Sequence, residues 1–206
     1  MSRRLIVLIL LGTAGGGAWW FLSGGPRGTV ANSPPREGPI VAFGDSLTFG
    51  IGAAPGQTYP EQLGRLIDKP IVNMGVPGET AEDALGRIDE VIAMKPGIVL
   101  VCLGGNNLLQ NKPLDETFRV LDIMVKRLID EGAMVALIGI EGLPMVTPDY
   151  SGRFDALAAK HQVLYVPDFL DGIYGRGRLM ADPIHPNGEG YAIISKRIAK
   201  AMKPYL

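Results

Sequence analysis

The sequence predicts an α/β fold in which helices cover both faces of a five-stranded parallel sheet. From residue 39 onward, short apolar runs alternate with helical patterns. Most of the apolar runs are continuous in Val, Ile and Leu, which is typical of strands that are covered on both faces. Alternation of strands and helices indicates βαβ units. A chain of 206 residues is long enough for one such domain and an appendage.

The five strands are expected at residues 40–44, 70–74, 97–103, 133–140 and 163–166. The single cysteine, Cys102, lies in the third of these runs and has no partner for an internal disulfide. We expect Cys102 to occupy a buried strand position and not to act as a reactive thiol.

Three helices are indicated by apolar residues that recur at helical spacing. The first stripe consists of Ala81, Ala84, Leu85, Ile88, Val91 and Ile92. Thr80 and Asp83 have the spacing of a capping box at its start. The second stripe follows Pro113 and consists of Leu114, Phe118, Leu121, Val125 and Leu128. The last helix is expected at about residues 188–202, with its inward face made by Tyr191, Ile194 and Ile198.

The chain is expected to have three parts: an N-terminal segment at 1–22, a flexible linker at 23–38 and the domain at 39–206. Arg3 and Arg4 precede a strongly apolar run that extends from Leu5 to Leu22. As a helix this run would span about 27 Å, close to the hydrocarbon core of about 30 Å. An uncleaved membrane anchor is favoured over a cleaved signal peptide. Both alternatives place the domain in the periplasm or cell envelope.

The charge pattern argues against nucleic acid as a partner. The net charge is −1, and the charged residues are interspersed without a basic stripe. With two histidines and no cysteine cluster, no metal and no other cofactor is expected. His161 is expected to be a solvated cation at the end of a helix.

Polar or glycine-rich segments follow four of the expected strands. Gly44-Asp45-Ser46-Leu47 follows the first strand, Asn73 to Thr80 follows the second, and Leu103 to Asn107 follows the third. Asp182 and His185 follow the last strand, just before the final helix. Because ligands bind at the carboxyl ends of parallel strands, we expect these segments to form one site.

The residue types in these segments are those that acyl transfer requires. Ser46 would be the nucleophile, His185 the general base and Asp182 the residue that fixes the imidazole tautomer. Gly78 can bring a backbone N–H close to the substrate, and Asn106 offers a neutral side-chain donor. Asp45 is expected to be a loop or helix-cap residue and not a participant.

These residues resemble the motifs of the GDSL esterases and lipases of the SGNH hydrolase superfamily. The resemblance covers about residues 39–206 and is greatest to the bacterial thioesterase I, lysophospholipase and arylesterase branch. The four block residues of the superfamily fall in order on Ser46, Gly78, Asn106 and His185, with the catalytic aspartate at Asp182. The resemblance implies a flavodoxin-like three-layer sandwich. It also implies an oxyanion hole made by the Ser46 and Gly78 amides together with Asn106.

The chain departs from the usual pattern of the third block, which reads Gly-x-Asn-Asp. Asn107 replaces the aspartate, at a position that generally supports the loop. The alternative elbow of the α/β-hydrolases, G-x-S-x-G, is not met, since Thr48 stands where the second glycine would be.

Apolar residues on the loops after the third and fourth strands are candidates for an acyl-chain groove. These are Leu108, Leu109, Leu143, Pro144 and Met145. Ordinary packing is the alternative explanation for them. Tyr150 or Arg153 is a further candidate for closing the groove.

The predicted function is a serine esterase that cleaves small to medium acyl esters, thioesters or lysophospholipids through an acyl-enzyme on Ser46. The expected partners are a small acyl ester or lipid, and the membrane through the N-terminal segment, with the chain as a monomer. An envelope carbohydrate O-deacetylase of the same superfamily and an inactive acyl-binding module are the alternatives. A nucleotide-binding flavodoxin-like protein is disfavoured because the loop after the first strand has no glycine-rich phosphate cradle.

Overall fold

The computed structural model describes residues 29–140, 148–167 and 169–206. The segment 1–22, expected to be an anchor or signal, lies outside these residues. Within the described ranges, no helix has both the length and the apolar character that are needed to cross a membrane.

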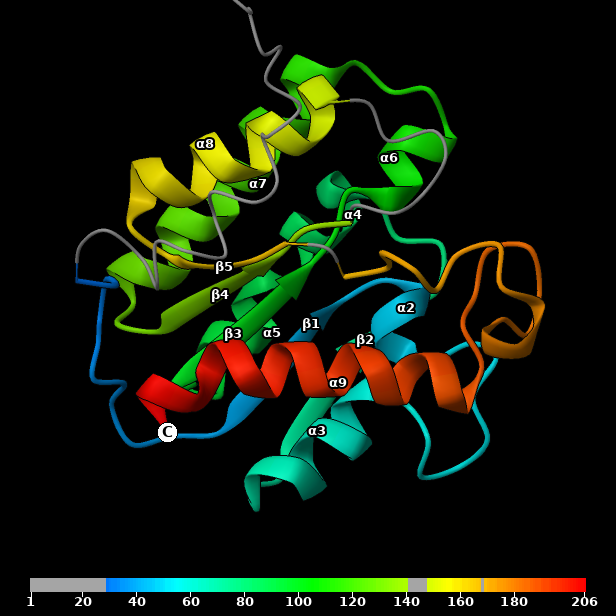
Figure 1. Ribbon diagram of the computed structural model, residues 1–206. Helices are drawn as coiled ribbons and strands as arrows, with labels where there is room; N and C mark the ends of the chain where they lie inside the picture. The colour runs from blue at the N-terminus through cyan, green and yellow to red at the C-terminus, as the bar shows by residue number, and fades with distance from the viewer. Residues whose placement is uncertain (1–28, 141–147, 168) are drawn as a thin grey trace, which may run out of the picture.

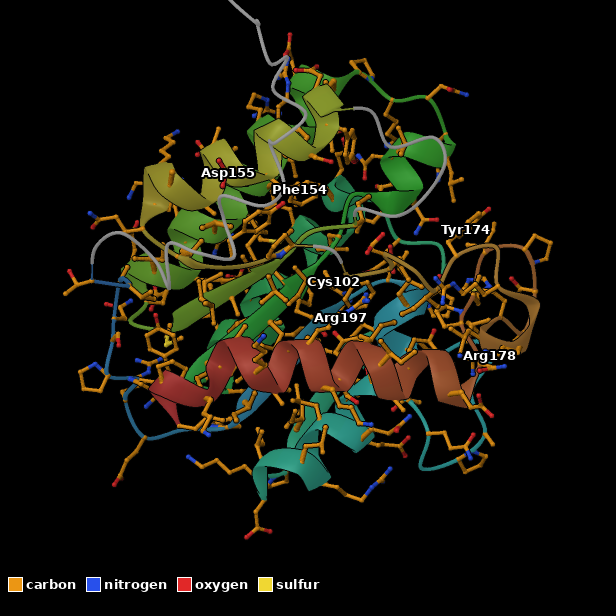
Figure 2. All side chains as sticks on the ribbon, in the orientation of Figure 1. Cys102, Phe154, Asp155, Tyr174, Arg178 and Arg197 are labelled. Atoms are coloured by element: carbon orange, nitrogen blue, oxygen red, sulfur yellow. The ribbon has the colours of Figure 1, made fainter. Side chains whose placement is uncertain are left out.

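The centre of the fold is a parallel sheet of five strands with the order β2-β1-β3-β4-β5 (Figure 1). The strands are β1 (Ile40–Gly44), β2 (Ile71–Gly75), β3 (Ile98–Cys102), β4 (Met134–Ile138) and β5 (Leu164–Val166). This order is the flavodoxin-like one, so the predicted fold class is confirmed. Cys102 is buried at the end of β3, as expected, and is labelled in Figure 2.

Helices form a layer on each face of the sheet (Figure 1). One layer contains α3 (Tyr59–Ile67) and α9 (Gly188–Met202). The other contains α4 (Ala81–Gly86), α5 (Ile88–Ala93), α7 (Leu114–Asp130) and α8 (Pro148–His161). Two short helices, α2 (Ser46–Phe49) and α6 (Gly105–Leu109), directly follow β1 and β3. The single-turn helices are η1 (Gly177–Leu179) and η2 (Lys203–Tyr205).

Alternate residues of the strands enter two separate hydrophobic cores. In β1, Val41 and Phe43 pack with the α4, α5, α7 and α8 layer, which also buries Phe154 (Figure 2). Ile40 and Ala42 pack with the layer of α3 and α9. The edge strand β2 is the exception to the expected two-sided burial, since Val72 is 38% exposed.

The predicted helices form, with one difference. The capping box of Thr80 and Asp83 begins α4, as expected. The single stripe predicted over 81–92 is divided at Arg87, which ends α4 and precedes α5. The backbone of Arg87 is not helical (φ −116°, ψ 13°), and its side chain bonds to backbone oxygens at the end of the sheet.

Residues 29–38 belong to the folded domain and not to a flexible linker. Val30 is buried in the core of the α3 and α9 layer. The N–H of Ala31 donates to the carbonyl of Gln162 at 2.8 Å. The Asn32 amide donates to the carbonyls of Ile129 and Ala133, each at 2.9 Å. These hydrogen bonds join residues that are 97 to 131 positions apart, so composition alone did not reveal them.

Candidate active site

The four polar segments meet at the carboxyl end of the sheet. Ser46 is the first residue of α2, directly after β1, and Asn106 lies on α6, directly after β3. Gly78 lies between β2 and α4, while Asp182 and His185 lie between β5 and α9. The predicted clustering of these segments is therefore what the structure shows.

Ser46, His185 and Asp182 form a continuous series of hydrogen-bonding atoms. Ser46 Oγ lies 3.0 Å from His185 Nε2, and His185 Nδ1 lies 2.7 Å from Asp182 Oδ2. When Nδ1 carries the proton that Asp182 accepts, Nε2 is left with the lone pair that faces the serine hydroxyl. This is the geometry that a general base requires.

Asp182 is held in place by backbone donors as well as by the imidazole. Its Oδ1 accepts the N–H groups of Ile184 and His185, each at 2.7 Å. Partial burial raises the pKa of Asp182, but the hydrogen bonds from the His185 ring and from both amides outweigh it and lower the pKa overall. Asp182 is therefore ionised at neutral pH and can stabilise an imidazolium.

A close approach of two loops brings His185 to Ser46. Gly52 has φ +88°, and a Cβ there would lie 2.5 Å from the carbonyl oxygen of Pro186 and 2.7 Å from Ala181 Cβ. Only glycine fits this position, because both the backbone angle and the space exclude a side chain. The His185 loop closes on itself through the N–H of Ala181, which donates to the His185 carbonyl at 2.9 Å.

The segment after β5 is tied to α9 by Arg197, which is labelled in Figure 2. Its guanidinium donates to the carbonyls of Phe169 at 3.1 Å and Asp171 at 2.7 Å. Asn187 caps α9 by accepting the N–H groups of Glu189 and Gly190. The chain before and after His185 is thus anchored to the same helix.

Asp45 caps the short helix that begins with Ser46. Its Oδ1 accepts the N–H of Leu47 at 3.0 Å, and the side chain is buried, which confirms the expected role. Burial raises the pKa of Asp45 to about 6. A buried carboxylate is therefore present directly behind Ser46 at neutral pH.

The backbone N–H groups of Ser46 and Gly78 are available as hydrogen-bond donors in the candidate site. In the ranges that the structure describes, neither N–H is paired with an acceptor. Gly78 has φ +83°, and a Cβ there would meet nothing within 4 Å. The left-handed backbone therefore favours glycine at 78.

Asn106 occupies the third expected donor position, and its amide is already engaged. Asn106 Nδ2 donates to the carbonyl of Glu79 at 2.8 Å and lies 3.4 Å from Asp45 Oδ2. The contact with Asp45 is at the long limit of a hydrogen bond. A stronger acceptor bound in the site would therefore displace Asp45, and not Glu79, as the partner of the Asn106 amide.

Asn107 supports the neighbouring loop, as expected. It is fully buried, and its Oδ1 accepts the N–H of Ala81 at 2.8 Å, at the start of α4. Its Nδ2 donates to Glu82 Oε2 at 2.8 Å, and Lys112 Nζ lies 3.2 Å from the same oxygen. An aspartate at 107 would offer no donor to Glu82, so the amide suits this chain.

The predicted groove residues are only partly placed. Leu108 is half-buried and packs against the core, and Leu109 is 40% exposed. Leu143, Pro144 and Met145 lie outside the described residues. Tyr150 is buried and donates to the Gly104 carbonyl at 2.7 Å, so it supports the loop that precedes Asn106.

Arg153, the other candidate for closing the groove, pairs with Asp115 of α7. One further expectation needs correction. His161 is not a solvated cation, since its side chain is only 12% exposed and its Nε2 lies 2.6 Å from Asp122 Oδ1.

Sequence reasoning missed several residues around the site. Glu79 and Arg87 form a bidentate ion pair beside Gly78, and the only signal for them was two opposite charges that flank a motif. Phe49 and Val76 are apolar, 51% and 40% exposed, and lie on the segments that carry Ser46 and Gly78. Their position in the motif segments could have indicated contact with a ligand.

The fold and the arrangement of the site together are compatible with a hydrolase. A hydroxyl, an imidazole and a carboxylate follow one another at hydrogen-bond distance, as acyl transfer requires.

Comparison with known proteins identifies the family. The model of the GDSL-like Lipase/Acylhydrolase family matches residues 42–193, and the chain belongs to this family. It is 30% identical to "Esterase TesA" of Pseudomonas aeruginosa over 178 residues, which cover 81% of this chain and 89% of that protein. It is 26% identical to "Arylesterase" of Vibrio mimicus, with the same coverage of 81% and 89%.

Solved structures agree with this assignment. The crystal structure of TesA has a TM-score of 0.74 and 31% identity, covering 82% of this chain and 99% of that one. The psychrotrophic esterase EstA from Pseudoalteromonas sp., inhibited by monoethylphosphonate, has a TM-score of 0.72 and 27% identity, covering 82% and 98%. The chain is therefore an esterase-type hydrolase.

Proposed function

We propose that this hydrolase cleaves acyl esters through a covalent acyl-enzyme on Ser46. The observation that carries the proposal is the series Ser46 Oγ, His185 Nε2 and Nδ1, and Asp182 Oδ2, with separations of 3.0 Å and 2.7 Å. The roles assigned to these atoms follow from their order, since the hydroxyl of Ser46 lies beside the acceptor nitrogen of His185.

In the first half-reaction, Ser46 Oγ attacks the carbonyl carbon and its proton passes to His185 Nε2. The carbonyl oxygen becomes an oxyanion, which would accept the N–H groups of Ser46 and Gly78 and the amide of Asn106. When the intermediate collapses, the bond to the leaving group breaks, and the leaving group takes the proton from His185. Water then attacks the acyl-enzyme, with His185 again as base, and releases the acid and free Ser46.

We infer that the substrates are esters of small to medium acyl chains, with thioesters and lysophospholipids as further candidates. The names of the relatives, an esterase and an arylesterase, support ester substrates. The exposed apolar side chains of Phe49, Val76 and Leu109 supply contact surface for an apolar acyl chain or leaving group.

The test is turnover of a p-nitrophenyl ester series from acetate to dodecanoate by the full chain, with Ser46→Ala as the control. We expect hydrolysis that depends on Ser46 and has its highest kcat/KM at short or medium length. Activity on acetylated glycans with none on the esters would favour the O-deacetylase. Retention of an acyl ligand without product release would favour the binding module.

We also propose that the protein works outside the cytoplasm, carried there by its N-terminal segment. Arg3 and Arg4 followed by the apolar run to Leu22 support this location. Cell fractionation combined with N-terminal sequencing tests it, because an anchor keeps residues 1–22 in the membrane fraction and a signal peptide loses them. Full-length protein in the cytosol would contradict the proposal.

A further inference from the structure

The segment that carries Gly78, residues 76–80, is held mainly at its two ends. The N–H of Val76 donates to the carbonyl of Gly44 at 2.9 Å, at the end of β1. Thr80 is fixed by the capping box that begins α4. Gly78 itself is exposed, and a Cβ there would touch nothing within 4 Å. Packing around Gly78 therefore does not determine where its N–H points.

Glu79, the next residue, makes the strongest side-chain contact of this segment. Its two carboxylate oxygens accept Arg87 Nε at 2.5 Å and Nη2 at 2.6 Å. The Arg87 and Glu79 side chains are only 14% and 11% exposed. Such a bidentate pair fixes the relative orientation of both groups, and water screens it little.

Arg87 is in turn fixed to the end of the sheet. Its Nη2 donates to the carbonyl of Met74 at 2.8 Å and lies 3.5 Å from the carbonyl of Gly44. Its guanidinium carbon lies 4.6 Å from the ring centroid of Phe43, which is a cation–π distance. The guanidinium thus connects Glu79 to the last residues of β1 and β2.

The backbone of Glu79 also holds the other predicted oxyanion donor. Its carbonyl accepts Asn106 Nδ2 at 2.8 Å, and its peptide nitrogen is bonded to Gly78. The N–H of Glu79 donates to the carbonyl of Val76 at 3.3 Å, which closes the turn that contains Gly78. A displacement of Glu79 therefore shifts this turn and the Asn106 amide together.

We propose that the Arg87–Glu79 ion pair is the positioning device of the oxyanion hole, aligning the Gly78 N–H and the Asn106 amide with the nucleophile Ser46. Arg87 and Glu79 touch no reacting atom and act through these two donors, so both are positioning residues. The inference rests on the proposed acyl transfer at Ser46. A preorganised donor set stabilises the transition state and has little effect on ground-state binding.

The test compares Arg87→Met, Arg87→Lys and Glu79→Gln with the unmodified full chain. Misplacing donors by about 1 Å costs roughly 100-fold in rate, so we expect kcat on p-nitrophenyl acetate to fall about 100-fold in Arg87→Met. KM should change less than about threefold, since substrate binding is not the affected step. Arg87→Lys and Glu79→Gln each keep part of the contact and should retain intermediate kcat values.

The matched control is Arg127→Met. Arg127 forms a comparable ion pair with Asp89, at 2.5 Å, between α7 and α5, but its side chain is 42% exposed. This variant should keep kcat within about twofold of the unmodified chain, because exposed ion pairs contribute little. Circular dichroism and Tm establish that each variant is folded, and if Arg87→Met is not, the two conservative variants carry the test.

A second readout separates alignment from a general structural effect. A trifluoromethyl alkyl ketone adds reversibly to the serine and leaves an alkoxide in the oxyanion hole. Its Ki should rise by about the factor by which kcat falls, while a non-reactive alcohol product binds unchanged. Folded Arg87 and Glu79 variants with unchanged kcat and Ki would overturn the inference. Absence of turnover in the unmodified chain would instead overturn the proposed function.

Discussion

Ser46 and His185 are separated by 139 residues in the chain, yet Ser46 Oγ lies 3.0 Å from His185 Nε2. The sheet topology brings the two segments to one edge, and the close contact at Gly52 sets the final distance between their loops. Both side chains are accessible, since the imidazole is 18% exposed and Ser46 is half-buried. A substrate carbonyl can therefore reach the hydroxyl.

The role of Asp182 predicts a loss of rate without a loss of fold. Asp182→Asn keeps acceptors for the two backbone N–H groups but no longer selects the tautomer with the proton on Nδ1. We expect kcat to fall about 10⁴-fold, as for a comparable change in other triads. Because Asp182 is 42% exposed, Tm should change by only a few degrees. Steady-state kinetics and thermal unfolding of the variant measure both effects, and a loss of less than tenfold would contradict the assigned role.

Asn106→Ala tests the third oxyanion donor. Removal of one donor typically costs about 10²–10³ in kcat, and we expect a loss in this range with KM nearly unchanged. Asn106→Asp is the informative companion, because it keeps the size but replaces the donor with an acceptor next to the Asp45 carboxylate. Its kcat should fall at least as far. An effect confined to KM in either variant would rule out the oxyanion role.

The raised pKa of Asp45 predicts that the stability difference between the unmodified chain and Asp45→Asn depends on pH. In the folded state burial raises its pKa from 3.8 to about 6. Below pH 3.8 the Asp45 carboxyl is protonated in both the folded and the unfolded state, so its ionisation does not change the free energy of unfolding. Between pH 3.8 and 6 only the unfolded state ionises, so the unmodified chain loses stability as pH rises, and above pH 6 the loss is constant.

We therefore expect Asp45→Asn to be more stable than the unmodified chain by about 3 kcal/mol at pH 7.5, with the difference vanishing near pH 3.5. The asparagine keeps an acceptor for the N–H of Leu47, so the helix cap is retained. Urea unfolding of both proteins at the two pH values measures the difference. Equal stability at pH 7.5 would show that the buried carboxylate is not penalised.

The contacts of Asn107 predict that aspartate, the usual residue of the family at this position, lowers the stability of this chain. Asn107→Asp would place a carboxylate where Nδ2 now donates to Glu82, 2.8 Å away, in a fully buried position. We expect a loss of about 1–3 kcal/mol in unfolding free energy at neutral pH. Adding Glu82→Gln should restore most of it, because a glutamine can donate to the new aspartate. A destabilisation that Glu82→Gln leaves unchanged would argue against this pairing.

The sequence was sufficient to predict the sheet and the clustering of the motif segments at one end of it. The strands are continuous apolar runs with motif residues directly after them, so the rule for parallel sheets places Ser46, Asn106 and His185 at one edge. These are local patterns. The flavodoxin-like strand order came from the family resemblance, since periodicity alone does not fix which strands are neighbours.

Several of the missed features depend on contacts that the local sequence pattern does not contain. Asn32 is fixed by carbonyls near residue 130, and His161 is held by Asp122 of α7. At the break between α4 and α5, Arg87 contacts Glu79 and the end of β2. Composition and helical periodicity report only on neighbours within a few positions, so they contain no information about such contacts.

The most direct test of the proposed mechanism is to locate the adduct formed with a fluorophosphonate. A phosphonate-inhibited structure is known for the esterase EstA of Pseudoalteromonas sp., and the same chemistry should apply to a serine activated by His185. The full chain is treated with the reagent, digested, and the modified peptide is identified by mass spectrometry, with His185→Ala as a folded control. We predict stoichiometric modification at Ser46 that is lost in His185→Ala. Modification at another residue, or none in the folded protein, would contradict nucleophilic catalysis by Ser46.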